Sequence, residues 1–117
     1  MAVILNLTID QGATFSKTFT IYATDTTVLN LTGYTIRGEM RKAYAASTSQ
    51  EFAISCPEPT TGVVTISLTA TQTAALTAGK YVYDVETSSP AGTVARTLQG
   101  NATVTPEVTR TATGIVA

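Results

Sequence analysis

The sequence predicts an all-β protein, an immunoglobulin-like antiparallel β-sandwich of about seven to nine short strands with one short helical turn. Polar and apolar residues alternate with a period of two in a succession of short segments. Turn-forming Gly, Pro, Asn and Asp residues separate these segments at regular spacing. Threonine, a β-branched residue that suits strands, makes up about a fifth of the chain. A small barrel is the alternative architecture, and the polar face of each strand argues against a parallel sheet.

The clearest element is a long β-hairpin over residues 76–100. One face of its first strand carries Tyr81, Tyr83 and Val85, and the other carries Val82, Asp84 and Glu86. Pro90 fixes φ and Gly92 tolerates positive φ, so the segment between the strands predicts a turn. Residues 93–98 resume the alternation and return antiparallel to the first strand.

The other strands are expected at residues 3–9, 14–22, 34–41, 51–56, 62–69 and 101–105. Lys17 falls on an apolar strand face, which indicates either a side chain that reaches solvent near a strand end or a bulge. Gly38 on another apolar face indicates close approach of a neighbour or a bulge. Residues 71–76 predict a helical turn with Thr71 as its N-cap and Gly79 at its end.

Strand phase also predicts which side chains form the core. The predicted core residues are Phe15, Phe19, Ile21, Ile36, Ile54, Val64, Ile66, Leu68, Leu76, Tyr83, Val85 and Leu98. We expect residues 1–110 to form one immunoglobulin-like sandwich domain and residues 111–117 to form a C-terminal tail that makes an interface.

The composition argues against several classes of function. The net charge is −1 and charged residues are only 13% of the chain, so we expect no nucleic-acid partner. No apolar run reaches membrane-spanning length, and the N-terminal residues lack the features of a secretory signal, so we expect no membrane association. The single cysteine, Cys56, rules out an internal disulfide and fits a small core residue made in a reducing cytoplasm.

We expect no enzymatic activity, no cofactor and no metal. Histidine is absent, which removes the usual general base and the commonest transition-metal ligand. Asp84 and Glu86 lie two apart on a strand, so their side chains share a face at about 7 Å. That spacing is compatible with a divalent cation or a glycosidic bond, but a solvated polar face paired with Arg96 or Thr97 is the favoured interpretation.

The tyrosines leave a second alternative open, since aromatic rings stack on sugars. They are Tyr22, Tyr34, Tyr44, Tyr81 and Tyr83. Three of the five occupy in-phase strand positions, which favours packing in the core or between the sheets over a carbohydrate platform.

The order of several segments resembles a known family. The segments are residues 10–15, 30–37, 78–86, 92–96 and 104–110. Together they look like the small immunoglobulin-like virion proteins of tailed bacteriophages and, more distantly, the N-terminal domain of phage baseplate upper proteins. The resemblance covers about residues 8 to 110, nearly the whole chain.

This resemblance implies a non-enzymatic structural subunit of a tailed-phage virion, made in the host cytoplasm, that joins or decorates other virion proteins. The tail, baseplate or fibre junction is the expected location, and the expected partners are tail, fibre or capsid subunits in an oligomeric particle. The alternatives are a decoration (cement) protein on the capsid surface and a free carbohydrate-binding or host-adhesion module.

The candidate interface residues come from three parts of the chain. They are Val3, Ile4 and Leu5 at the N-terminus, Arg37, Glu39 and Arg41 on one strand face, and Ile115 and Val116 in the tail. The N-terminal strand is uncharged, and an exposed edge of this kind tends to pair with another chain. Residues 3–9 therefore either bind a neighbouring subunit or form the first strand of the sandwich itself. The charged triplet is either an interface patch or a solvated face with local ion pairs, each worth little.

Overall fold

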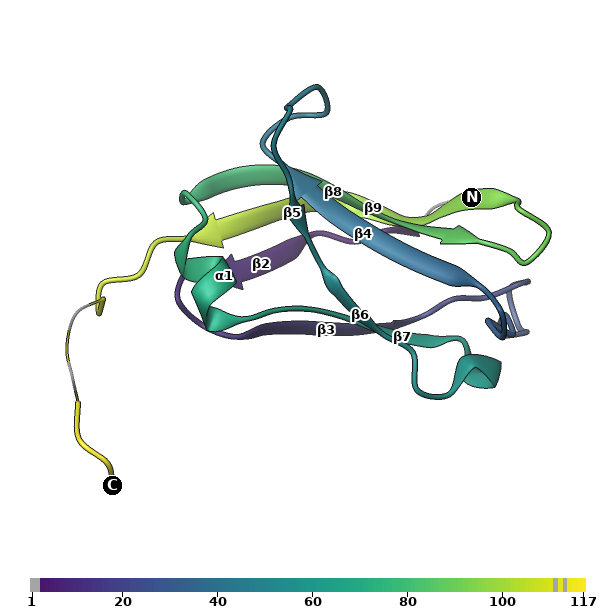
Figure 1. The fold of residues 1–117 in the computed structure, drawn as a ribbon, viewed down its shortest axis with the longest axis horizontal. Helices are drawn as coiled ribbons and strands as arrows, with labels where there is room; N and C mark the ends of the chain where they lie inside the picture. Colours follow the sequence, from purple (N-terminus) through teal and green to yellow (C-terminus); the bar gives the residue numbers. More distant parts are fainter. Residues whose placement is uncertain (1–2, 111, 113) are drawn as a thin grey trace.

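The computed structural model describes residues 3–110, 112 and 114–117, and it is an all-β sandwich of two packed sheets (Figure 1). The larger sheet has six strands in the order β1-β9-β8-β4-β5, with β2 also paired to β9. The smaller sheet has the order β3-β7-β6. The strands are β1 (Val3–Ile4), β2 (Leu7–Asp10), β3 (Phe15–Thr20), β4 (Thr35–Arg41), β5 (Gln50–Glu51), β6 (Ala53–Ser55), β7 (Val63–Leu68), β8 (Gly79–Ser88) and β9 (Val94–Thr105).

This strand order is that of an immunoglobulin-like sandwich. Such a domain places its second, fifth and fourth strands in one sheet and its third, sixth and seventh strands in the other. Here β3, β7 and β6 form the first of these sets, and β4, β8 and β9 form the second. The chain changes sheets at Phe52, which lies between β5 and β6, is buried, and donates its backbone N–H to the Gly38 carbonyl at 2.9 Å.

The hairpin of β8 and β9 is as predicted. Ser89 closes its turn, since its backbone N–H donates to the Thr93 carbonyl at 2.8 Å and its side chain accepts from the Thr93 N–H at 3.0 Å. Gly92 in this turn has φ +93°. The pairing shifts between Val85 and Glu86, where Thr97 is the extra residue of a β-bulge.

The N-terminal strands differ from the antiparallel arrangement predicted for every strand. Both β1 and β2 run parallel to β9, with Val3 opposite Leu98 and Leu7 opposite Ala102. Parallel pairing is possible because no hairpin joins these strands, so nothing local fixes their relative direction. The side chains of β2 alternate as predicted, and Leu7 and Ile9 are buried.

The predicted core is confirmed. The predicted residues that are fully buried are Ile21, Val64, Ile66, Leu68, Tyr83, Val85 and Leu98. The remaining predicted residues, which pack against the buried ones, are Phe15, Phe19, Ile36, Ile54 and Leu76. The prediction omitted other buried residues, namely Leu7, Ile9, Leu31, Met40, Phe52, Tyr81, Ala102 and Val104.

Two local expectations about strand residues are settled. A Cβ on Gly38 would lie 3.1 Å from both the Asp84 carbonyl oxygen and a methyl of Val85, so the glycine permits close approach as predicted. Lys17 is exposed, and β3 pairs with β7 without a register shift, so its side chain reaches solvent and no bulge is present there.

The helical turn begins earlier than predicted. The helix α1 spans Ala70–Ala74, and its N-cap is Thr69, not Thr71. The Thr69 side chain accepts from the Gln72 N–H at 3.1 Å, and the Gln72 side chain accepts from the Thr69 N–H at 2.9 Å. This reciprocal capping box stabilises the start at Thr69, because it satisfies two backbone donors at once. A single 3₁₀ turn, η1 (Pro59–Thr61), precedes β7.

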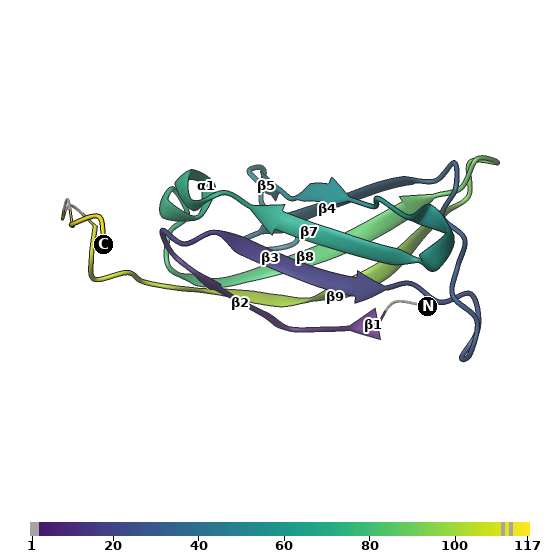
Figure 2. The same cartoon turned by 90° about the horizontal axis from the view of Figure 1, so that it is seen from below.

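The segment after β9 leaves the sandwich. Figures 1 and 2 show it extending from the end of the molecule opposite to β1 and to the β8–β9 turn. Ile115 is 95% exposed and Val116 is fully exposed. Within the described residues, neither helical segment has the length and apolar character needed to cross a membrane.

Candidate functional site

The outer face of the six-stranded sheet carries the charged residues predicted to lie together. Arg37 and Glu39 on β4 face Glu86 and Asp84 on β8. The side chains form ion pairs between Arg37 and Glu86 at 3.1 Å, between Arg41 and Glu39 at 3.2 Å, and between Arg96 and Asp84 at 3.3 Å. We call these six residues the charged face. Arg96 was a predicted partner of this strand, and its contact with Asp84 is confirmed.

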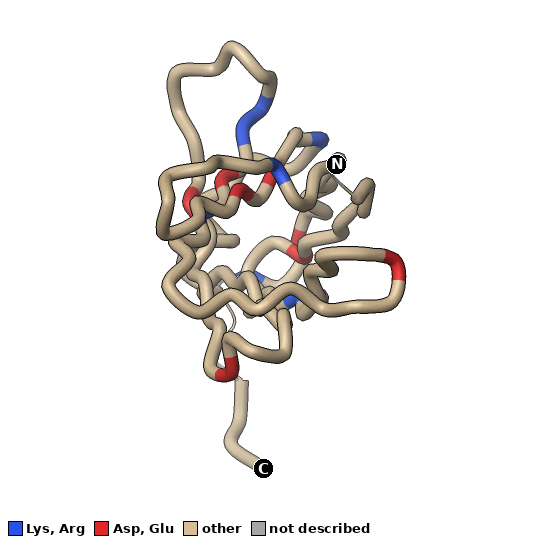
Figure 3. Tube along the Cα trace, turned by 90° about the vertical axis from the view of Figure 1, so that its right-hand side faces the viewer, with Lys and Arg blue, Asp and Glu red and all other residues tan. Residues whose placement is uncertain are grey.

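The charged face is balanced, with three arginines and three carboxylates. Burial raises the pKa of the Asp84 carboxyl, and the neighbouring Glu86 and Glu39 raise it further, while Arg96 and Arg41 act in the opposite direction. The pairs are partly exposed, so each contributes little to stability. Elsewhere charge is sparse, and Figure 3 shows long uncharged stretches between the coloured positions.

The pairing of the carboxylates with arginines leads to a prediction about metal binding. A cation bound between Asp84 and Glu86 would have to displace Arg96 and Arg37. In the part of the chain that the structure describes, no group of three or more His, Cys, Asp or Glu residues is placed to hold a metal. We expect elemental analysis of purified protein to find no stoichiometric calcium. Calcium that is retained by the parent and lost in Asp84→Asn or Glu86→Gln would contradict this.

Two of the tyrosines are structural. The Tyr81 hydroxyl donates to the Thr77 carbonyl at 2.8 Å, and Tyr81 lies near the start of β8. This is the tyrosine corner of immunoglobulin-like domains, in which a tyrosine near the start of the sixth strand bonds to backbone a few residues upstream. Tyr83 is also buried, and its ring meets that of Phe52 edge-on at 6.0 Å. Core packing of these two residues is therefore confirmed.

Tyr83 also holds the N-terminal segment against the sandwich. Its hydroxyl donates to the carbonyl oxygen of Leu5, which lies between β1 and β2. The Leu5 N–H donates to the Gln99 carbonyl at 2.9 Å, so this residue is tied to β9 as well. Burial raises the pKa of Tyr83 to about 12.

This shift predicts an alkaline loss of stability. Below pH 10, Tyr83 is protonated in both the folded and the unfolded chain, and its contribution to stability is fully present. Between pH 10 and 12 the unfolded chain releases this proton and the folded chain does not, so stability falls by about 2 kcal/mol. Urea unfolding at pH 8 to 12 should show this decline, and Tyr83→Phe should remove that part of it. An equal decline in both proteins would contradict the assignment.

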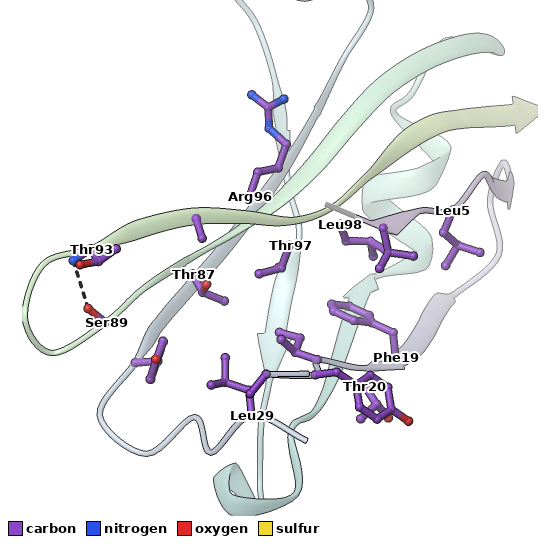
Figure 4. Close-up of a pocket in the computed structure, with 16 residues that line it drawn as sticks. Leu5, Phe19, Thr20, Leu29, Thr87, Ser89, Thr93, Arg96, Thr97 and Leu98 are labelled. Atoms are coloured by element: carbon purple, nitrogen blue, oxygen red, sulfur yellow. Dashed lines mark hydrogen bonds between the residues drawn. The ribbon is translucent and has the colours of Figure 1, made fainter. Parts of the chain in front are cut away.

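An open groove separates the two sheets on the side where β1 lies. It encloses about 660 Å³, and its apolar lining is Val3, Leu5, Phe19, Ile21, Leu29 and Leu98, together with the rings of Tyr22 and Tyr34. We call it the apolar groove. Figure 4 shows Leu5, Phe19, Leu29 and Leu98 directed into it. Arg96 contributes to its rim, but the side chain points away, toward Asp84 on the charged face (Figure 4).

The groove is flanked by a strand edge of the smaller sheet. This edge is β3, which pairs with β7 on its other side. It presents backbone groups that an additional strand can pair with. Opposite β3, the groove is bordered by Ala95 and Thr97 at the start of β9, which pairs with β8.

The predicted interface residues fall into three separate places. Val3 and Leu5 line the apolar groove, while Ile4 is 71% exposed on the other face of β1. The second set, Arg37, Glu39 and Arg41, lies on the charged face. The third set, Ile115 and Val116, lies in the exposed segment beyond β9. The prediction missed the groove itself, since its lining comes from segments distant in the sequence.

The strand order and the tyrosine corner together define the class of this protein as an immunoglobulin-like β-sandwich. No protein-family model matches the sequence, and no curated protein matches it. Among solved structures, an internalin-like protein of Listeria monocytogenes is similar, with a TM-score of 0.48 and 19% sequence identity. The match covers 89% of this chain and 28% of that one, so the chain spans less than a third of that protein's length.

Proposed function

We propose that this chain is a non-enzymatic structural subunit that works by binding other proteins, and that it belongs to the virion of a tailed bacteriophage. The observation that carries the binding role is the apolar groove with the β3 strand edge that flanks it. Apolar surface and unpaired backbone are costly in water, and a partner strand satisfies both. The Val3 side chain, which lines the groove and is 63% exposed, extends this surface along β1.

The virion setting rests on the segments that resemble phage virion proteins. Residues 10–15 connect β2 to β3, residues 30–37 lead into β4, and residues 78–86 form most of β8. The first two include tight turns, such as the one in which Asn30 accepts from the Thr32 N–H at 3.0 Å. These segments therefore shape the sandwich. A junction at the tail, baseplate or fibre is the proposed location, with the capsid surface as the alternative.

A free glycan-binding module is the second candidate, and one observation favours it. Tyr44 is 85% exposed and lines a polar hollow of about 290 Å³ together with Glu39, Arg41, Asp84 and Gln99. Aromatic rings beside paired charged groups suit a sugar, which offers both apolar faces and hydroxyls. Tyr22 lies in the apolar groove, away from this hollow, so the exposed tyrosines do not form one platform.

The experiment that tests the proposed function is quantitative mass spectrometry of purified phage particles from an infected or induced host. We expect the chain at a fixed stoichiometry to the other virion proteins. A glycan array with purified protein is the parallel measurement, in which Tyr44→Ala is compared with the parent. Absence from particles, combined with glycan binding that Tyr44→Ala abolishes, would overturn the proposal and support the second candidate.

A further inference from the structure

The apolar groove has features that suit an added strand. It is bordered by the β3 edge and by the start of β9, and side chains such as Phe19, Leu29 and Leu98 line it. Thr87, which is also in the lining, is almost fully buried. Among the described residues that line the groove, the one charged side chain, that of Arg96, turns away toward Asp84. An occupant must therefore be uncharged, partly apolar and able to adopt an extended conformation.

One segment of the chain has these properties and contacts little of its own domain. Residues 114–117 carry no charged side chain. Ile115 and Val116 are the most exposed large apolar residues of the described chain, together with Val108 at 94%. The segment lies at the end of the molecule opposite to the apolar groove and extends away from it (Figure 2).

We propose that the apolar groove of one copy receives residues 114–117 of a second copy as an added β-strand. Main-chain hydrogen bonds to the β3 edge supply affinity, and alternate side chains enter the groove. The direction of the segment indicates that it enters the groove of another copy and not the groove of its own domain. The segment points away from its own domain, and filling its own groove requires a full reversal along the length of β9.

This arrangement has a structural consequence. The groove and the donated segment lie at opposite ends of the sandwich, so the contact is head-to-tail and differs on its two sides. A head-to-tail contact produces a ring if the rotation closes and an open chain if it does not. The inference deepens the proposed structural role, because it names a second copy of this chain as a partner.

Strand addition makes a sharp prediction for the donated segment. Successive side chains of a strand point to opposite faces, so only one of Ile115 and Val116 enters the groove. Sedimentation velocity of the full chain over a concentration series should show concentration-dependent oligomers. We expect one of the single variants Ile115→Asp and Val116→Asp to weaken self-association more than tenfold, and the other to change it less than threefold.

The role of the groove in this contact is tested by matched variants of two neighbouring residues of β9. Ala95 lines the groove, whereas Val94 is 52% exposed and is not in the lining. Ala95→Asp should weaken self-association more than tenfold, and Val94→Asp should leave it unchanged. A chain that stays monomeric at every concentration, or an equal loss in both members of either pair, would overturn strand addition.

Cross-linking distinguishes a second copy from the chain's own segment. In a Cys56→Ser background, chains carrying Ala95→Cys are mixed with chains carrying the groove-facing Ile115→Cys or Val116→Cys variant. Oxidation should give a disulfide-linked dimer of the two chains. A chain with both cysteines that yields only a cross-linked monomer would overturn the proposal. Incorporation into particles is a separate readout, so a monomeric chain found in particles overturns this inference and leaves the proposed function standing.

Discussion

Leu68→Ala is expected to lower the free energy of unfolding by about 2–5 kcal/mol. Leu68 is 1% exposed and lies at the end of β7, the central strand of the three-stranded sheet. It pairs with Phe15 across the sheet and belongs to the main cluster of the core. Truncation removes apolar contacts and leaves a cavity that the surrounding strands cannot fill. Thermal unfolding should show a fall in Tm of about 10–20 °C.

The matched control for this variant is Val94→Ala, which shortens an apolar side chain that is 52% exposed in β9. We expect it to change the free energy of unfolding by less than about 0.5 kcal/mol. An unchanged Tm in Leu68→Ala would remove this residue from the core and shift the phase of β7. It would also weaken the assignment of Val64 and Ile66 to the core, because their side chains lie on the same face of β7 as that of Leu68.

The elements that the sequence predicts well are those whose partners are close in the chain. The β8–β9 hairpin is specified by its own alternation and by a turn between residues 89 and 93. The tyrosine corner is equally local, because Tyr81 bonds to Thr77 four residues before it. A tyrosine just after a short helical turn and a glycine was an available signal for it.

The elements that the sequence does not predict depend on distant partners or on competing local choices. The direction of β2 is decided by β9, and the hydrogen bond from Thr105 to Asp10 spans 95 positions. Leu31 is buried although it lies outside any strand, because it packs in a cluster with Ile21 and Val64. Its N–H donates to the Pro59 carbonyl at 2.8 Å, which joins two segments distant in the sequence. For α1, both Thr69 and Thr71 are suitable N-caps, and only Gln72 decides between them.

The candidate site is predicted only in pieces for the same reason. Alternation along β4 correctly places Arg37, Glu39 and Arg41 on one face, since the strand period alone determines this. The apolar groove is different, because it forms where β1, β3 and β9 meet at one side of the sandwich. The lack of charge in residues 3–9 made them an interface candidate, but their neighbours in space were not predicted.

Gly100→Ala is expected to detach the N-terminal segment from β9 and to lower the free energy of unfolding by about 2–3 kcal/mol. A Cβ at Gly100 would lie directly against the carbonyl oxygen of Leu5 and 2.9 Å from its carbonyl carbon. These are backbone atoms, so a side-chain rotation cannot relieve the clash. The chain must move away, and the bonds at risk are Leu5 N–H to Gln99, Asn101 N–H to Asn6 at 3.1 Å, and Tyr83 to Leu5.

The readouts for Gly100→Ala are urea unfolding and amide hydrogen exchange at Leu5, which should become fast relative to the strands of the core. Gly92→Ala is the matched control, because Gly92 has φ +93° and no atom within 4 Å of an added Cβ. It should cost only about 1 kcal/mol of backbone strain and leave exchange at Leu5 unchanged. Equal effects of the two variants would contradict the close approach of Leu5 to β9.

The same variant should affect partner binding, because Val3 and Leu5 line the apolar groove. Gly100→Ala should weaken the binding of any partner in this groove, whereas Gly92→Ala should not.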